Sequence, residues 1–453
     1  MQPLSSNSPG RHDRPALLAN LEQEALRLGF SRIGVATADP ALRDPRLHEQ
    51  FRRWLDQGHA GVMTHWLEQH EPLRRDPRNL LDGARSVIML ATDHALHAAA
   101  DRHGDGHGHG HELDEAPDHH GACPPGQGRV ARYAWGDDYH DLLRSRVNSL
   151  AAWLEAAVPG CRTRGFVDSA PFPEREFGWL AGLGWFGKNT MLIDPTAGSY
   201  FLLTVLLTDA DLPASTPLEV DHCGTCTACL DACPTAAFVE PRMLDANRCL
   251  SAITIEDHAA VDSQLRGEMA DWIFGCDICQ EVCPWNRRAP GSAEPTFQPR
   301  DGRATLPLAE LLALDDAGFR SRFKGSPLTR AKRSGLLRSA ALALGNRPDP
   351  ASADALTAAL ADDDSIVRGA AAWALGRWRG SEPTLAARAH ESLTARLPIE
   401  ADATVRAEIE AALLEDSLQP VSLSGQRHSS PPHAHSAVSS TSAEASRPGP
   451  SSR

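Results

Sequence analysis

Eight of the ten cysteines in this 453-residue chain follow a spacing that can hold iron–sulfur clusters. The first group runs C-x2-C-x2-C-x3-C-P over residues 223–234, the second runs C-x2-C-x3-C-P over 276–284, and Cys249 lies between them. Two-residue loops turn three thiolates toward one cluster, whereas the cysteine before each proline points toward the other cluster. We therefore predict two 4Fe-4S clusters with crossed ligands, one held by Cys223, Cys226, Cys229 and Cys283, the other by Cys233, Cys249, Cys276 and Cys279.

The same cysteines have two simpler interpretations, a zinc ribbon and a disulfide framework. A zinc ribbon usually pairs two C-x2-C knuckles and has no use for a third cysteine two residues further on. The N-terminal residues lack the apolar segment of an export signal, and no apolar run reaches the roughly eighteen residues of a membrane span. We expect a cytoplasmic enzyme without a membrane association that keeps these thiols reduced and metallated. Cys123 and Cys161 are left over as inert thiols.

Hydrophobic periodicity divides the rest of the chain. Residues 15–215 alternate helical and strand patterns, which predicts an α/β domain. A His-, Gly- and Asp-rich insert at 94–121 interrupts it, and we expect a disordered loop there. The insert contains a D-x-H-x-x-G match at 105–110, a pattern that elsewhere supplies a lower ligand to cobalamin. In a low-complexity sequence such a match arises easily by chance. Residues 216–300 form the predicted ferredoxin-like segment.

The C-terminal part carries an internal repeat. LLRSAALALG at 336–345 recurs as IVRGAAAWALG at 366–376 and, more faintly, as TVRAEIEAAL at 404–413. A period near thirty with Ala/Leu faces predicts paired helices of the HEAT-like class that stack into a short α-solenoid over 301–416. We expect the ends, 1–14 and 417–453, to be disordered. The predicted fold class is thus α+β and multidomain.

A local reversal of charge precedes the repeats. The net charge of −14 argues against indiscriminate binding of nucleic acid. The stretch Phe319–Asn346, however, is free of acidic residues, as expected for a face that docks a phosphate backbone; an ordinary solvated helix face is the alternative. Its basic residues are Arg320, Arg322, Lys324, Arg330, Lys332, Arg333 and Arg338.

Over about residues 15–380 the sequence resembles the epoxyqueuosine reductase family. The resemblance rests on RYAWGDDYHDLLRSRV, VDSAPFPEREFGWLAGLGWFGKNTMLI, CGTCTACLDACPTAAF, LDANRCLSAITIE, IFGCDICQEVCPWN and RAKRSGLLRSAALALGN. It implies a base-off cobalamin beside one cluster, reduced through the pair of clusters by an external electron donor. It also implies removal of the epoxide oxygen from the modified wobble base of tRNA, whose anticodon stem-loop the HEAT-like domain helps to hold, by a protein that we expect to be a monomer.

The resemblance also implies roles for individual residues. Asp168, in VDSAP, is the implied general acid, and burial against the corrin would keep its carboxyl group protonated. An aspartate at the end of a strand is more often a helix cap or a turn residue. Further candidates for cofactor contacts are Arg75 in LRRDP, Lys188 and Asn189 in the GKN turn, and Cys276 and Asp277, where a cluster would approach the corrin.

Two other functions are compatible with parts of the pattern. A reductive dehalogenase-like enzyme also joins cobalamin to two 4Fe-4S clusters, but such proteins are typically exported and have no need of a basic solenoid. A ferredoxin-type electron carrier with a HEAT scaffold would need no cobalamin, so corrin bands in the visible spectrum would exclude it.

Overall fold

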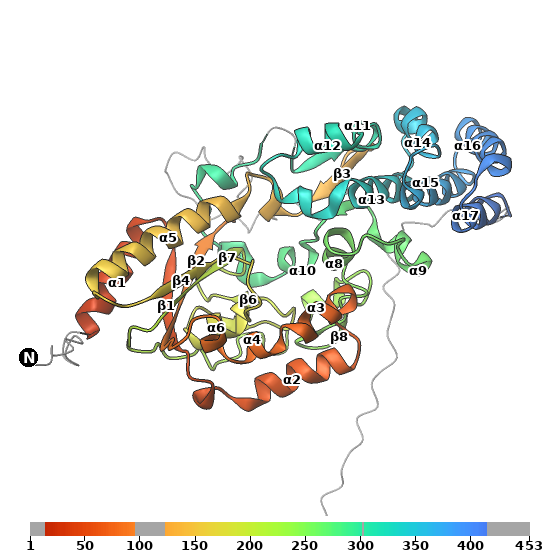
Figure 1. The fold of residues 1–453 in the computed structure, drawn as a ribbon. Coiled ribbons are helices and arrows are strands. Elements are labelled where there is room, and N and C mark those ends of the chain that lie inside the picture. Colours follow the sequence, from red (N-terminus) through yellow and green to blue (C-terminus); the bar gives the residue numbers. More distant parts are fainter. Residues whose placement is uncertain (1–13, 96–122, 301–302, 415–453) are drawn as a thin grey trace, which may run out of the picture. The chain divides into compact units, whose positions relative to one another are not determined.

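The structure is a computed structural model that describes residues 14–95, 123–300 and 303–414 (Figure 1). The predicted lead-in before Arg14, the insert from residue 96 to 122 with its D-x-H-x-x-G match, and the tail from 415 lie outside the described residues. His94, at the predicted start of the insert, is buried and its ring contacts Tyr200 and Phe297. In the described ranges no helix is both long and apolar enough to cross a membrane.

The N-terminal region is built on a four-stranded sheet. Its strands are β1 (Arg32–Thr37), β2 (Ser86–Asp93), β7 (Phe201–Thr208) and β4 (Thr163–Phe166), in the spatial order β1-β2-β7-β4. Each neighbouring pair is antiparallel, with Ile88 opposite Leu206 at the centre. An α/β domain has a mostly parallel sheet, so that part of the predicted fold class is wrong. Alternation of helix and strand along a sequence does not fix the direction of the strands.

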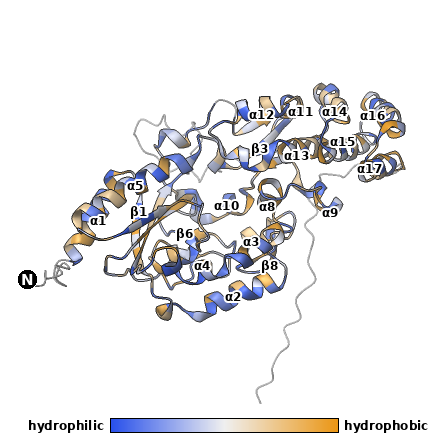
Figure 2. Ribbon diagram, viewed as in Figure 1, coloured by the Kyte–Doolittle hydropathy of each residue, from blue (hydrophilic) through white to orange (hydrophobic). Residues whose placement is uncertain are grey.

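Both faces of this sheet are covered, which explains why β2 reads as a continuous apolar run. Ile88 and Leu90 pack against α1 (Arg14–Arg27) and α5 (Tyr139–Ala157), whereas Val87 and Met89 pack on the face that holds α6 (Glu174–Leu180). Residues alternate between faces along a strand, so each face receives every second side chain of β2. Figure 2 shows much of this sheet in the orange of hydrophobic residues and α2 (Pro45–Asp56) mostly in blue.

A second, three-stranded sheet joins distant segments of the chain. β3 (Gln127–Val130) pairs in parallel with β10 (Trp272–Phe274) and antiparallel with β11 (Thr305–Pro307). The strand that opens the RYAWGDDYH motif therefore belongs to a sheet with the cysteine-rich segment. The predicted division at residue 215 did not anticipate this pairing, because one sequence does not show which strands become neighbours.

The cysteine-rich segment consists of short elements. Its helices and strands are α7 (Ala228–Asp231), β8 (Phe238–Glu240), β9 (Met243–Leu244), α8 (Leu250–Ile255), α9 (Ser263–Arg266) and α10 (Ile278–Glu281). The remaining short helices of the chain are α3 (Thr64–Gln69), α4 (Glu71–Arg75), α11 (Leu308–Leu312) and α12 (Asp316–Arg322), and the short strands β5 (Trp185–Phe186) and β6 (Leu192–Ile193) form a small hairpin.

The predicted repeats are confirmed as stacked helices. α13 (Lys332–Asn346) packs on α15 (Ser365–Trp378), and α15 packs on α17 (Ala403–Leu414), while α14 (Ala353–Ala359) and α16 (Pro383–Arg396) are the second helices of the pairs. Gly376 permits the close approach of α17, since a Cβ there would lie 2.7 Å from the Cβ of Ala412. The indole of Trp378 donates a hydrogen bond of 2.7 Å to the carbonyl of Leu344 and ties α15 to α13.

Candidate active site and cluster-binding segment

The four cysteines of the first set are neighbours in the structure. Burial raises the pKa of the Cys229 thiol to about 11, and repulsion from Cys283 and Cys223 adds to the shift. Burial also raises the pKa of Cys283, with Cys223 and Cys226 as neighbouring thiols. Cys283 belongs to the second group in sequence, yet it lies beside the first three cysteines in space.

The second set forms in the same way. Burial raises the pKa of Cys276 well above its ordinary value, and Cys249 and Cys233 add to this. The pKa of Cys279 is raised by burial and then by Cys276 and Cys249. Cys229 of the first set also contributes to the raised pKa of Cys279, so the two sets are neighbours. Positively charged iron offsets the repulsion between neighbouring thiolates when they bind it.

The cysteines remain free thiols in this structure. Within the described ranges no three His, Cys, Asp or Glu side chains converge closely enough to hold a single metal ion. A four-iron cluster binds each thiolate to a different iron atom, so its ligands stand farther apart than those of one ion.

The GKN turn holds the cluster loops. The Nζ of Lys188 donates to the carbonyls of Gly224 at 2.7 Å and Cys226 at 2.9 Å. The buried Asn189 donates from Nδ2 to the carbonyl of Cys279 at 3.3 Å. Both side chains thus have partners in the protein, one in each cysteine group, and a corrin contact by either stays a prediction.

Aromatic side chains cover the first set. Trp185 and Trp285 meet edge to face with ring centroids 5.0 Å apart, and His222 packs against both. Cys283 and Cys223 belong to the same apolar cluster. Such a cover limits the access of water, which is one means by which a protein tunes a cluster's potential.

Asp168 lies in a loop just after β4. Its backbone has φ 46, a left-handed conformation that a non-glycine residue rarely adopts. It does not cap the next helix, because Pro173 stands at the N-cap of α6 without a side-chain hydrogen bond. The cap alternative raised for this aspartate is therefore not what the structure shows.

The Asp168 carboxyl group is exposed but lies close to other protein groups. Its side chain is 69% exposed, yet desolvation by the protein around it raises its pKa, against the hydrogen bond from Tyr139, which lowers it. The Tyr139 hydroxyl donates to Oδ2 of Asp168 at 3.1 Å, and Nε2 of His140 lies 4.0 Å from the same oxygen. A group that is open to a ligand but surrounded by protein on its other sides is suited to proton transfer.

A second carboxyl group lies close to Asp168. The pKa of Glu174, the first residue of α6, is raised to about 7, mainly by burial and partly by the charge of Asp168. Its buried Oε1 has no hydrogen-bond partner among the described residues. The neighbouring cations are Arg74 and Arg175. Arg74 donates to the carbonyl of Phe172 in this loop, at 3.2 Å, and a cofactor contact by its neighbour Arg75 stays a prediction.

Asp277 and Cys276 lie on the cluster side of the same region. Oδ2 of the buried Asp277 accepts from the backbone N–H of Arg132 at 2.7 Å, and burial raises its pKa to about 6. Tyr133 lies near both sides. Burial is the main cause that raises the pKa of its hydroxyl, and the charges of Asp168 and Asp277 contribute to the rise. The predicted residues Asp168, Cys276 and Asp277 are thus brought into one region.

Sequence reasoning gave no role to Tyr133, Tyr139, His140 and Glu174. The first three stand in RYAWGDDYH and the last in PFPEREF, two of the motifs that carried the resemblance. Their presence in those motifs was the available signal, but only the fold places them around Asp168.

The basic stretch proves to be of mixed character. Arg338 is fully buried and donates to the carbonyls of Asp257, Ala259 and Ile253. Its inclusion in a phosphate-docking face is wrong, because these main-chain acceptors enclose its guanidinium. Arg333 is only 16% exposed and forms an ion pair with Asp362.

The rest of the stretch is more accessible. Arg322 pairs with Glu310 at 3.0 Å. Arg330 forms an ion pair with Glu256 at 2.7 Å while its side chain remains 61% exposed. Its charge also acts to lower the pKa of Asp168. Three further basic side chains are exposed, those of Arg320, Lys324 and Lys332.

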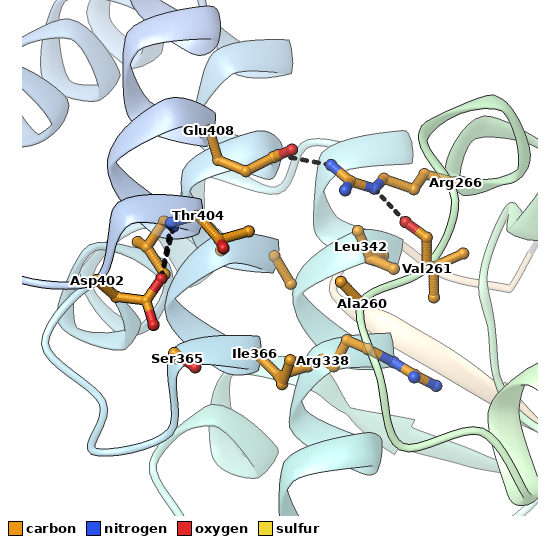
Figure 3. Close-up of a pocket in the computed structure, with 13 residues that line it drawn as sticks. Ala260, Val261, Arg266, Arg338, Leu342, Ser365, Ile366, Asp402, Thr404 and Glu408 are labelled. Carbon is orange, nitrogen blue, oxygen red and sulfur yellow. Dashed lines mark hydrogen bonds and ion pairs between the residues drawn. The ribbon is translucent and has the colours of Figure 1, made fainter.

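A cavity of about 120 Å3 lies where the cysteine-rich segment meets α13, α15 and α17 (Figure 3). Arg266 crosses it and donates to the Glu408 carboxylate at 2.6 Å and to the Val261 carbonyl at 2.8 Å. The ion pair between Arg266 and Glu408 therefore links the cysteine-rich segment to α17 of the repeats.

The cysteine sets and the stacked helices define a class, an iron–sulfur oxidoreductase with a HEAT-repeat region. Residues 222–286 match the family of the 4Fe-4S double cluster binding domain, and 328–414 match HEAT repeats. Residues 74–169, which contain RYAWGDDYH and Asp168, match the family described as epoxyqueuosine reductase QueG, DUF1730.

Whole-chain relatives identify the family. The chain is 39% identical to the epoxyqueuosine reductase of Pseudomonas aeruginosa over 83% of its own length and 98% of that protein. A solved epoxyqueuosine reductase with an epoxyqueuosine-modified tRNA-Tyr stem loop is 30% identical and superposes with a TM-score of 0.73, over 88% of this chain and 98% of that one. The Bacillus subtilis enzyme, with the loop of its catalytic aspartate swung out of the active site, is 28% identical with a TM-score of 0.75 over the same shares. The chain belongs to the epoxyqueuosine reductase family.

Proposed function

We propose that this protein reduces epoxyqueuosine to queuosine at the wobble position of tRNA, the last step of queuosine synthesis, with Asp168 as the general acid. The observation that carries the proposal is the state of Asp168, which is exposed toward a ligand and has a raised pKa. Its left-handed backbone costs on the order of 1–3 kcal/mol, and such strain concentrates at active sites.

The reaction explains why an acid is needed. Removing the oxygen of an epoxide as water, to leave a carbon–carbon double bond, takes up two electrons and two protons. The oxygen leaves poorly as an alkoxide, so a proton must reach it as the carbon–oxygen bond breaks. Asp168 holds such a proton, and Tyr139 keeps its carboxyl group in position.

We infer that cobalamin binds beside Asp168 and the second cysteine set. The polar atoms of the region fit the amide-rich rim of a corrin, since the buried Glu174 Oε1 and Tyr200 hydroxyl have no hydrogen-bond partner in the described residues. When bound, cobalamin supplies a low-potential cobalt that acts as a nucleophile or electron donor at the substrate carbon. Arg75, Lys188, Asn189, Cys276 and Asp277 remain the proposed contacts from the sequence.

For the two 4Fe-4S clusters we propose the crossed ligand sets, Cys223, Cys226, Cys229 and Cys283 for one and Cys233, Cys249, Cys276 and Cys279 for the other. The proximity of Cys283 to the first three cysteines supports this assignment. The second set lies beside Asp277, and we propose that it is the one nearer to the cobalamin. An external donor delivers electrons.

For tRNA we propose a docking face made of Arg320, Lys324, Arg330 and Lys332. These side chains are exposed, and Arg330 connects the face to Asp168. An anticodon loop is largely unpaired, so presenting its base costs only about a few kcal/mol. In this scheme 15–215 is the catalytic, cobalamin-binding domain, 216–300 the two-cluster domain and 301–416 the tRNA-binding repeats of a cytoplasmic monomer.

Nucleoside analysis of tRNA tests the function. Cells that lack this gene should accumulate epoxyqueuosine in place of queuosine, and the intact gene should restore queuosine. An unchanged queuosine content in the deletion strain would contradict the proposal.

A further inference from the structure

One carboxyl group cannot complete the reaction alone. The proposed reduction consumes two protons for each oxygen that leaves as water, whereas the Asp168 carboxyl group carries one. After its first proton transfer Asp168 is a carboxylate, and it must be protonated again in every turnover. The groups beside it show how this is arranged.

His140 stands between Asp168 and Asp138. Its Nδ1 lies 2.7 Å from Oδ1 of Asp138, and its Nε2 lies 4.0 Å from Oδ2 of Asp168. The second distance exceeds a direct hydrogen bond, and a rotation of the exposed Asp168 side chain or one bridging water closes it. The imidazole therefore has one nitrogen directed to each carboxyl group.

Asp138 fixes the tautomer of His140. It is the N-cap of α5, and its Oδ1 also accepts from the backbone N–H of His140 at 3.0 Å. The hydrogen bond with His140 lowers the pKa of Asp138, so Asp138 is a carboxylate that only accepts. Nδ1 must then carry a hydrogen, which leaves Nε2 as the nitrogen that gains and loses a proton.

The imidazole ring is also held in place. It stacks on the ring of Tyr139, with centroids 4.1 Å apart and planes 24° apart. Tyr139 in turn donates to the same Asp168 oxygen that faces Nε2. One residue thus orients both the acid and its neighbour, and His140 itself is 29% exposed and reachable by solvent protons.

We propose that His140 is a proton relay that reloads Asp168 from solvent, with Asp138 as its positioning residue; this rests on the proposed function. Asp168 gives its proton to the departing oxygen. The imidazolium then gives the Nε2 proton to the Asp168 carboxylate, and neutral His140 takes a proton from solvent. Two such cycles supply the two protons, while the electrons come from the clusters.

The charged and titratable groups around this pair come from α5 and from four other parts of the chain. On α5 and its cap they are Asp138, Tyr139 and Arg144, and from the rest of the chain they are Tyr133, Glu174, Glu256 and Arg330. Asp138 alone among them is in hydrogen-bond contact with the imidazole. Asp138 is therefore the group that positions the imidazole ring.

The test uses the holoenzyme, a chemical reductant and an epoxyqueuosine-modified stem loop without oxygen. His140→Gln should keep the KM for the stem loop and lower kcat by about 100-fold, and added imidazole should restore activity to His140→Gly. Asp138→Asn, which retains an N-cap, should lower kcat with an unchanged KM, because an amide no longer fixes the tautomer of His140. His65→Gln, an exposed histidine on α3, is the matched control and should behave as the parent.

The outcomes separate the relay from the reaction itself. If the parent turns over and His140→Gln keeps both its kcat and its pH profile, the relay is wrong and the proposed function stands. A loss in His140→Gly that imidazole does not restore, with an unchanged kcat in Asp138→Asn, would also overturn the relay. If the parent does not turn over the stem loop, the proposed function fails and the relay fails with it.

Discussion

Cys283, the last cysteine of the second group, lies beside Cys229 of the first group. The two residues are far apart in sequence, and the chain returns from α10 to place them together. This relationship is the structural basis for assigning one cluster to cysteines from both groups.

Removing one cysteine should therefore damage the cluster of the opposite group. Cys283→Ser is expected to deplete the cluster of Cys223, Cys226 and Cys229, whereas Cys233→Ser should deplete the other. Iron quantification with electron paramagnetic resonance of each variant distinguishes the two clusters. If Cys283→Ser depletes the same cluster as Cys276→Ser, the crossed assignment is incorrect.

The docking face predicts a steep dependence of tRNA binding on salt. Joint replacement of Arg320, Lys324 and Lys332 by Ala should weaken tRNA binding and reduce the slope of log K against log salt by roughly 2–3, because each lost phosphate contact removes about one released counterion. Turnover of a minimal stem loop at saturation should change much less.

The matched control removes the same charge elsewhere. Arg27, Arg46 and Arg53 lie on α1 and α2 and are exposed, with 69%, 80% and 55% of their side chains accessible. Their joint replacement by Ala should leave the salt slope unchanged. Equal effects of the two triple variants would show that net charge, and not a docking face, governs binding.

The repeats should lose stability in acid through Glu400. This buried carboxylate accepts from Arg368 and Arg396, and the hydrogen bond with Arg368 is the main cause that lowers its pKa from 4.5 to about 2. A folded pKa below the unfolded value means that the stabilisation is complete above about pH 4.5 and is lost as the pH falls toward 2.

Thermal melts from pH 7 to pH 3 measure this contribution. Glu400→Gln should lower the melting temperature at pH 7 and weaken its dependence on pH in the acid range. Glu410→Gln, on α17, serves as the control. The assignment fails if Glu400→Gln melts with the same pH dependence as the parent.

Part of this architecture could be predicted from the sequence, because local spacing carries the information. The cysteine groups, the repeats that became α13, α15 and α17, and the strand that ends near Asp168 all depend on short-range patterns. The direction of the strands and the pairing of β3 with β10 depend on contacts between distant segments, which a single sequence does not reveal.

The basic stretch shows the same limit at the level of single residues. Charge counting treated Arg338 like Lys332, but α13 turns Arg338 inward to the carbonyls of 253–259 and leaves Lys332 exposed. The roles inferred for His140 and Asp138 likewise depend on the side-chain distances, which place them next to Asp168 only in the folded chain.

The proposed role of Asp168 as proton donor is tested most directly by Asp168→Asn. The amide keeps the size and much of the hydrogen bonding but has no acidic proton, so kcat should fall by roughly two to four orders of magnitude. The measurement is anaerobic turnover of an epoxyqueuosine-modified stem loop by the variant holoenzyme, with cobalamin absorbance and iron content recorded in the same sample. The account predicts intact cofactor content and almost no queuosine; turnover near that of the parent would contradict it.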